Sequence, residues 1–332
     1  MRLYAALEGA LLVAEGAPDD WTVSRRLTDD QLECVAAHPE RPDRVLCGTY
    51  ESGLLRSADG GESWTRVGPS SMADAVMAVA VNPHDPSEWW AGTEPSAVYH
   101  STDGGETWTR REGVTDLPSE PEWAFPPRPH THHVRWIEVD PADPAHLYVS
   151  IEAGALIQSR DRGETWADRV ASARRDTHSL TTHADTPGRA WAAAGDGYAE
   201  TSDGGETWDH PQRGLDHRYC WSVAVDADDP ELVLVSSARS ARTAHRSTSA
   251  ESYVYRRRSD GAWERADDGL RAGDGLLRAV LAAAPEGETF YALTNRGLYR
   301  TEDAGDRWRR QAIPWDDRYE NQTASGLVVL PE

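Results

Sequence analysis

The chain has 332 residues, which is enough for one large repeat domain or two ordinary domains. Its 56 acidic residues outnumber its 34 basic residues, none of which is lysine, and the formal net charge is −22 at pH 7. Nucleic acid is excluded as a partner, because its phosphate backbone would be repelled by this charge. No run approaches the ~18 apolar residues of a membrane span, so we expect none.

The start of the chain, residues 1–9, is interrupted by Glu8 and has no small-residue cleavage site. This pattern favours a strand over a signal peptide. Cys34, Cys47 and Cys220 are an odd set in apolar contexts, which is typical of free thiols in a reducing compartment. Together these features predict a cytoplasmic protein.

An eight-residue pattern, Ser/Thr-x-Asp-x-Gly-x-Ser/Thr-Trp, recurs along the chain. Four copies are near-perfect, one has Arg307 in the hydroxyl position, and two are weaker. The copies end at Trp21, Trp64, Trp108, Trp166, Trp208, Trp263 and Trp308. Most steps between them are 42 to 45 residues long, and a period of about 40 to 50 residues indicates a repeat architecture.

Each copy has the composition of a tight turn between two strands. The Asp carboxylate can accept hydrogen bonds from backbone N–H groups across the turn, and Gly adopts a positive φ without a Cβ clash. The Trp supplies a large apolar face to pack beneath the hairpin.

The pattern resembles the Asp-box, or BNR repeat, of sialidases, sortilin-like receptors, xyloglucanases and photosystem II assembly factors, and the periodic match covers essentially the whole chain. The resemblance implies a β-propeller in which the repeated aspartates serve folding and not catalysis. The acid excess without lysine resembles proteins of haloarchaeal type, in which high salt screens the repulsion between acidic side chains.

Short apolar runs separated by Gly, Pro and Asp turns predict an all-β, seven-bladed propeller of four-stranded antiparallel blades. In the second blade, strands are expected at residues 75–81, 88–92 and 97–101 and from residue 107. We expect one domain, 1–332, with blades at 31–68, 74–111, 130–170, 176–210, 217–266, 275–311, and 323–332 together with 1–27.

The last blade is expected to join the two ends of the chain. Residues 325–331 resemble the first strand of a blade, with no further strands after them. Residues 3–6, 10–14 and 21–24 supply the missing three strands. This pairing would close the ring and remove an exposed sheet edge.

Three insertions break the period, at residues 112–129, 237–251 and 311–322. In a propeller all three fall on the face opposite the tryptophan turns. Loops on a rigid scaffold often carry function, so we place a candidate ligand site on this face, at the mouth of the central channel.

Polar and aromatic side chains are expected to converge at this mouth from the starts of the inner strands and from the loops. Those from the strand starts are Glu33, His132, His133, Arg135, Asp176, His178, His217, Arg218, Tyr219 and Trp221, and those from the loops are Trp123, Glu152, Asp196 and Trp315.

Three interpretations of this set remain open. The first is a metal site for Zn²⁺ or a similar divalent ion, with an acid such as Glu33 or Glu152 beside imidazole ligands. The candidate imidazoles are those of His132, His133, His178 and His217.

The second interpretation is acid–base catalysis on an anionic or sugar-like ligand. Arg135 and Arg218 would bind a carboxylate. His178, His217 or Tyr219 would transfer the proton. The residues expected to hold the ligand are Trp123, Trp315, Glu33, Glu152 and Asp196. In the third interpretation, the same groups only form hydrogen bonds in a water-filled channel.

Two classes of function follow. One is a carbohydrate- or uronate-active enzyme, hydrolase-like or lyase-like and with or without a metal; the other is a non-catalytic scaffold for a protein partner. The resemblance to sialidases does not extend to their activity, because Arg135, Arg218 and Arg278 do not lie in a matching three-arginine motif.

Overall fold

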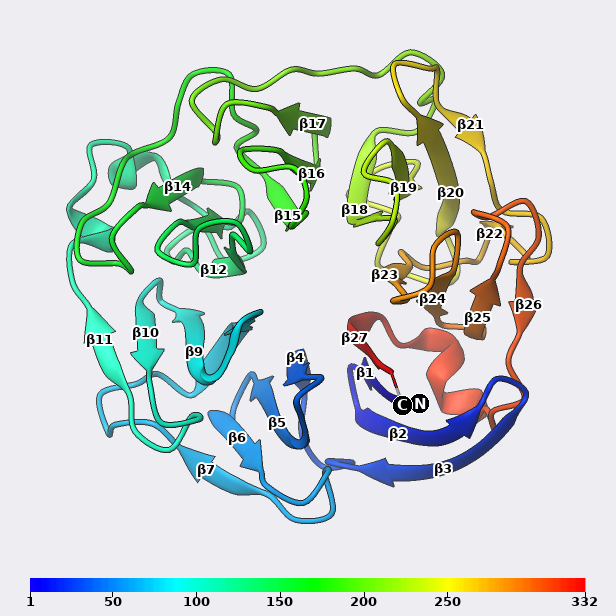
Figure 1. Cartoon of the computed structure of the whole chain (residues 1–332), viewed down its shortest axis with the longest axis horizontal. Helices are drawn as coiled ribbons and strands as arrows, with labels where there is room; N and C mark the ends of the chain where they lie inside the picture. The colour runs from blue at the N-terminus through cyan, green and yellow to red at the C-terminus, as the bar shows by residue number, and fades with distance from the viewer. Residues whose placement is uncertain (332) are drawn as a thin grey trace.

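The computed structural model describes residues 1–331 and forms a ring of seven small antiparallel sheets (Figure 1). The chain is nearly all β, as predicted. Blade one is built from β4 (Leu32–His38), β5 (Arg41–Thr49), β6 (Leu54–Ser57) and β7 (Thr65–Val67). Blade two is built from β8 (Ala75–Asn82), β9 (Asp85–Glu94), β10 (Val98–Ser101) and β11 (Thr109–Arg111).

Blades three and four each have three named strands and a fourth reduced to one bridge. Blade three contains β12 (Val134–Val139), β13 (Leu147–Ile151) and β14 (Ala155–Ser159), with the bridge Gln158–Ala167. Blade four contains β15 (Thr177–Thr182), β16 (Ala190–Ala194) and β17 (Gly197–Thr201), with the bridge Glu200–Asp209.

Blade five carries a short extra strand, and blade six is regular. Blade five contains β18 (Tyr219–Val225), β19 (Leu232–Ala238), β20 (Glu251–Arg258), β21 (Glu264–Arg265) and β22 (Gly273–Asp274). Blade six contains β23 (Val280–Ala283), β24 (Phe290–Thr294), β25 (Gly297–Thr301) and β26 (Arg309–Arg310).

Blade seven joins the two ends of the chain, and the predicted closure is confirmed. Its strands are, from the centre outward, β27 (Ala324–Leu330), β1 (Arg2–Leu7), β2 (Ala10–Ala17) and β3 (Asp20–Arg26). β27 and β1 are antiparallel, with Arg2 opposite Leu330. Glu332, the last residue of the range predicted for this blade, lies outside the described residues.

The tryptophan turns are held as their chemistry predicts. In blade two the Asp103 carboxylate accepts hydrogen bonds from the backbone N–H of Glu106 and Thr107 and from the Thr107 hydroxyl. Gly105 has a φ of 80°, and the indole of Trp108 donates to its carbonyl oxygen. These turns close the outer strands of the blades.

The hydrophobic core lies between neighbouring sheets. One cluster, for example, joins Tyr4 and Leu11 of blade seven to Leu32 and Val45 of blade one, all of them buried. Because each blade buries one face against the next, the ring holds the inner strands in fixed positions.

In six blades the inner strand carries one bulged residue, where its register with the next strand shifts. These residues are Glu33, Met77, Arg135, His178, Trp221 and Ser325. A β-bulge re-aims a side chain, and all six residues line cavities at the centre of the ring.

The helical elements are single 3-10 turns in the inserted loops: η1 (Val114–Asp116), η2 (Glu120–Glu122) and η3 (Asp317–Asn321). Within residues 1–331, no helix has the length and apolar character needed to cross a membrane.

Candidate functional site

A cavity of about 610 Å³ lies at the centre of the ring, on the face of the inserted loops. Its wall is formed by bulged residues of the inner strands, and residues 125–128 and 241–246 contribute to its rim. A smaller cavity of about 90 Å³ shares Glu33, Arg135 and Trp221 with it and reaches His178.

Two arginines share the indole of Trp221. The guanidinium carbon of Arg278 lies 3.5 Å from the ring centroid, and that of Arg135 lies 4.8 Å from it. Burial and, after it, the charge of Arg135 lower the pKa of Arg278 to about 9. Two cations are therefore held close together in the cavity wall.

The cavity guanidinium groups differ in how closely they are paired with other side chains. Arg135 is 7% exposed and donates no hydrogen bond within the described chain; its Nε lies 3.7 Å from Glu152 Oε2. Arg242 and Arg246, on the rim, form no ion pair with any described residue. In contrast, Arg128 forms two hydrogen bonds with the carboxylate of Glu94.

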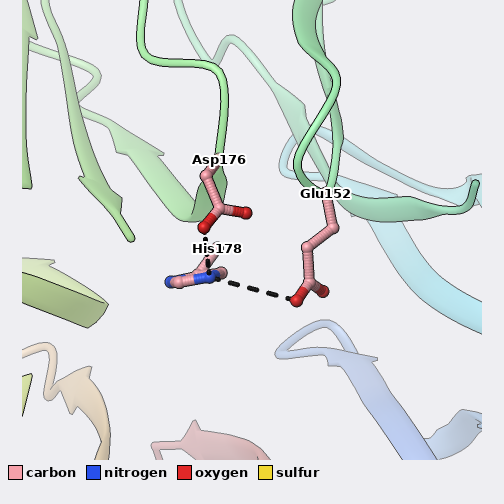
Figure 2. Close-up of side chains that lie close together, drawn as sticks. All are labelled: Glu152, Asp176 and His178. Carbon is pink, nitrogen blue, oxygen red and sulfur yellow. Dashed lines mark ion pairs between the residues drawn. The ribbon is translucent and has the colours of Figure 1, made fainter. Parts of the chain in front are cut away.

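A cluster of acids and imidazoles lies beside the arginines, and Figure 2 shows three of its members, Glu152, Asp176 and His178. His178 Nε2 is 3.6 Å from Asp176 Oδ2 and 4.0 Å from Glu152 Oε1. The other oxygen of Glu152 is 2.9 Å from His133 Nε2. Blade three contributes Glu152 and His133, and blade four contributes Asp176 and His178.

Burial and neighbouring charges set the protonation of this cluster. Burial opposes ionisation of Glu152, but the hydrogen bond from His133 and the nearby positive charges hold its pKa below its usual range. Burial raises the pKa of Asp176 and lowers the pKa of His178. Burial also raises the pKa of Glu33, although Arg135 opposes this effect.

A chain of hydrogen bonds joins Arg278, His245 and Tyr219. Arg278 Nε donates to His245 Nδ1 at 2.9 Å, and His245 Nε2 lies 3.0 Å from the Tyr219 hydroxyl. Desolvation and then the charge of Arg278 lower the pKa of His245 to about 3. A neutral His245 therefore carries its proton on Nε2, and this N–H donates a hydrogen bond to the Tyr219 hydroxyl oxygen.

The structure brings together part of the set expected from the sequence. Glu33, His133, Arg135, Glu152 and Tyr219 line the larger cavity, and His178 lines the smaller one. These residues come from blades one, three, four and five, as their positions at strand starts and in loops imply.

The remaining expected polar residues lie elsewhere. His132 contacts Ser96, with its Nδ1 2.8 Å from the hydroxyl oxygen. His217 packs against Tyr253 in a tilted arrangement, with ring centroids 4.4 Å apart. Two further residues are exposed away from both cavities, namely Arg218 and Asp196, the latter paired with Arg174.

The two expected aromatic residues are also outside the larger cavity. Trp123 is buried in the core of blade three, and its indole donates to the Ser119 hydroxyl. Trp315 packs beside blades six and seven, and its indole donates to the Asn295 carbonyl oxygen. Neither ring lines the larger cavity.

Asp176 and Trp221, which were expected at the channel mouth, also line the larger cavity, whereas Arg242, His245 and Arg278 line it without having been in the expected set. The position of Trp221 follows from its turn, since it lies five residues before Asp226, the acceptor of that turn. Arg135 lies equally far before Asp140, the acceptor in its own blade.

Comparisons with known proteins agree with this architecture. The family model described as photosynthesis system II assembly factor YCF48 matches residues 17–126. No curated protein matches the chain in sequence. The solved structure of YCF48 bound to D1 peptide is similar, with a TM-score of 0.61 and 17% identity over 90% of this chain and 87% of that chain.

Glycoside hydrolases are also similar in fold. An ancestral GH74 enzyme has a TM-score of 0.65 and 18% identity, covering 85% of this chain and 38% of its own. The GH74 xyloglucanase from Xanthomonas campestris has a TM-score of 0.64 and 18% identity, covering 85% of this chain and 45% of its own. The chain thus spans less than half the length of these enzymes. The repeats, the closed ring of seven blades and these similarities show that the chain is a β-propeller of the BNR type.

Proposed function

We propose that the central cavity binds a small carboxylate-bearing sugar of the uronic acid class, and that the protein acts on it as a lyase-like enzyme. The observation that carries this proposal is the arginine-rich wall, in which Arg135 is buried without a hydrogen-bond acceptor.

The charge of the cavity is opposite to that of the chain. Its lining contains five arginines against three acids, while the whole chain carries a net charge of −22. The arginines are Arg128, Arg135, Arg242, Arg246 and Arg278. A guanidinium can bind a carboxylate through two parallel hydrogen bonds, so this wall favours a ligand with a carboxylate over a neutral one.

The size and lining of the cavity suit a short saccharide. Its volume of about 610 Å³ lies within the range of about 300–1,000 Å³ typical of small-molecule sites. Phe125, Tyr50 and Tyr219 give it apolar surface beside the charged groups.

The surrounding groups support proton abstraction next to a bound carboxylate. Arg135 and Arg278 would stabilise the charge that develops when a base removes the adjacent C–H proton. Glu33 lines both cavities and is the base in this proposal. The electron pair of the C–H bond would form a carbon–carbon double bond as the substituent on the next carbon leaves with its bonding pair and gains a proton from Tyr219.

A ligand panel tests the proposal. Galacturonate and oligogalacturonates should raise the melting temperature, galactose should not, and the oligomers should give the ultraviolet absorbance of a conjugated double bond. Arg135→Gln should weaken binding by about ten- to a hundredfold, since one charged hydrogen bond contributes about 1.5–3 kcal/mol. The exposed Arg213→Gln is the matched control. No response to any acidic sugar would contradict the proposal.

A second candidate is a scaffold that binds a protein partner on the same face. It is supported by the family match at residues 17–126 and by the similarity to YCF48 bound to D1 peptide. The terminal carboxylate of a peptide would meet the same arginines. Peptides with a free C-terminus that bind more tightly than their amidated forms, without an effect of uronates, would favour this candidate.

A further inference from the structure

Three potential metal ligands converge where blades three and four meet the cavity. The free atoms are His178 Nε2, an Asp176 oxygen and a Glu152 oxygen, all within 4.8 Å of one another. Figure 2 shows the imidazole between the two carboxylates. Acidic groups alone do not make a metal site, so metal binding here depends on the protonation state of His178.

The hydrogen bond made by the other nitrogen of the His178 imidazole fixes its protonation state. His178 Nδ1 lies 2.6 Å from the carbonyl oxygen of Cys220. A carbonyl oxygen only accepts, so Nδ1 carries a proton and a neutral ring has its lone pair on Nε2. The side chain is fully buried, and Nε2 has no hydrogen-bond partner in residues 1–331.

In each carboxylate, one oxygen accepts a hydrogen bond and the other oxygen remains free. Glu152 Oε2 accepts from His133 Nε2, and Asp176 Oδ1 accepts from the backbone N–H of Ala153. The two remaining oxygens face His178 Nε2, so three lone-pair donors point at one place. Outer hydrogen bonds that orient each ligand in this way are typical of protein metal sites.

The spacing is too long for hydrogen bonds and suits an ion. The distances from Nε2 are 3.6 Å to Asp176 and 4.0 Å to Glu152. Ligand atoms bound at about 2.0–2.2 Å to one ion lie about 3–4 Å apart. The side chain of Asp176 is 31% exposed, so it has room to move toward the other two ligand atoms.

A glycine keeps the space beside these ligands open. A Cβ atom at Gly195 would lie 2.0 Å from Asp176 Oδ2 and 3.3 Å from the His178 ring. Any other residue at this position would displace the carboxylate from the cluster.

We propose that Glu152, Asp176 and His178 bind one divalent transition-metal ion of the zinc or manganese class. One imidazole and two carboxylates are a donor set that such ions accept. Glu152 and Asp176 also line the larger cavity, so the open position of the ion faces the proposed ligand. Only that last point rests on the proposed function.

Metal binding is tested on full-length protein prepared without a histidine tag and stripped with EDTA. Calorimetric titration with Zn²⁺ or Mn²⁺ should give about one equivalent per chain, and elemental analysis after dialysis should find the same amount. Asp176→Asn and His178→Gln should each weaken binding by roughly 10-fold or more. The control is His146→Gln, a buried histidine beside Asp140.

The possible outcomes distinguish loss of metal binding from loss of folding. Added metal should raise the melting temperature of the wild type and of His146→Gln, because an ion that binds only the folded state stabilises it. A folded wild type without stoichiometric binding overturns the proposal even if a variant fails to fold, and so does full binding by Asp176→Asn. Uronate binding measured in EDTA tests the proposed function separately.

Discussion

The guanidinium of Arg278 lies against the indole of Trp221, 3.5 Å from its ring centroid. The same arginine donates to the carbonyl oxygen of Ala324 at the start of β27. One wall of the cavity is therefore tied directly to the strand that closes the ring, which links the geometry of the site to the closure of the fold.

Trp221→Ala should damage both stability and the site. The side chain is 5% exposed, and loss of a buried tryptophan costs about 3–5 kcal/mol. It also removes the surface that positions Arg135 and Arg278. Chemical denaturation measures the first effect and uronate titration the second. Trp166→Ala, in a turn of the opposite face, should lower stability without affecting binding, and equal binding by both variants would contradict this role.

Shortening the C-terminus tests closure. Without β27 the edge of β1 loses its six paired residues, so a chain ending at Gln322 should lose cooperative unfolding by circular dichroism. A circular permutant with Met1 joined by a linker to the C-terminus, and new ends in the exposed turn at residues 184–185, should keep it. A truncated chain as stable as the full one would show that the ring does not depend on this pairing.

The repeated turns should contribute unequally. Asp103 accepts from the Thr107 hydroxyl as well as from backbone N–H groups, but Asp303 faces Arg307 and accepts only its backbone N–H there. Asp103→Ala should therefore cost more stability, about 1–3 kcal/mol, than Asp303→Ala. Urea denaturation measures the free energy of unfolding of both variants. Thr107→Val, which removes only the hydroxyl, should by itself lower this free energy by part of the difference between them. Equal losses would mean that the hydroxyl contributes nothing.

Glu138 should make stability depend on pH. Burial raises its pKa to about 7, although it accepts hydrogen bonds from Thr182 and Trp136. This value is above the pKa of the same glutamate in the unfolded chain. The stabilisation that Glu138 contributes is therefore complete below about pH 4.5 and is lost as the pH rises through 7. The slope is at most about 1.4 kcal/mol per pH unit. Denaturation between pH 4.5 and 8 should show a smaller slope for Glu138→Gln, and parallel curves would exclude this cause.

The ring itself was predictable because its signals are local. Each copy of the turn motif fixes a hairpin through bonds within a few residues, as at Asp103, and seven copies give seven blades. The closing blade also followed from local pattern, since residues 325–331 read as one strand without a partner in the adjacent sequence.

The site was only partly predictable because it depends on direction as well as position. Arg135 and His178 are aimed inward by β-bulges, whereas His217 and Arg218 precede β18 and are not oriented by strand alternation. Arg278 joins the cavity through contacts with Trp221, His245 and Ala324, which are distant in sequence. No spacing along the chain encodes such contacts.

A crystal structure of the protein with galacturonate or a short oligogalacturonate tests the proposed binding site most directly. We expect a sugar in the central cavity with its carboxylate within hydrogen-bonding distance of Arg135, and no such density when galactose replaces it. A sugar bound elsewhere, or a carboxylate directed away from Arg135 and Arg278, would show that the arginine-rich wall is not a carboxylate site.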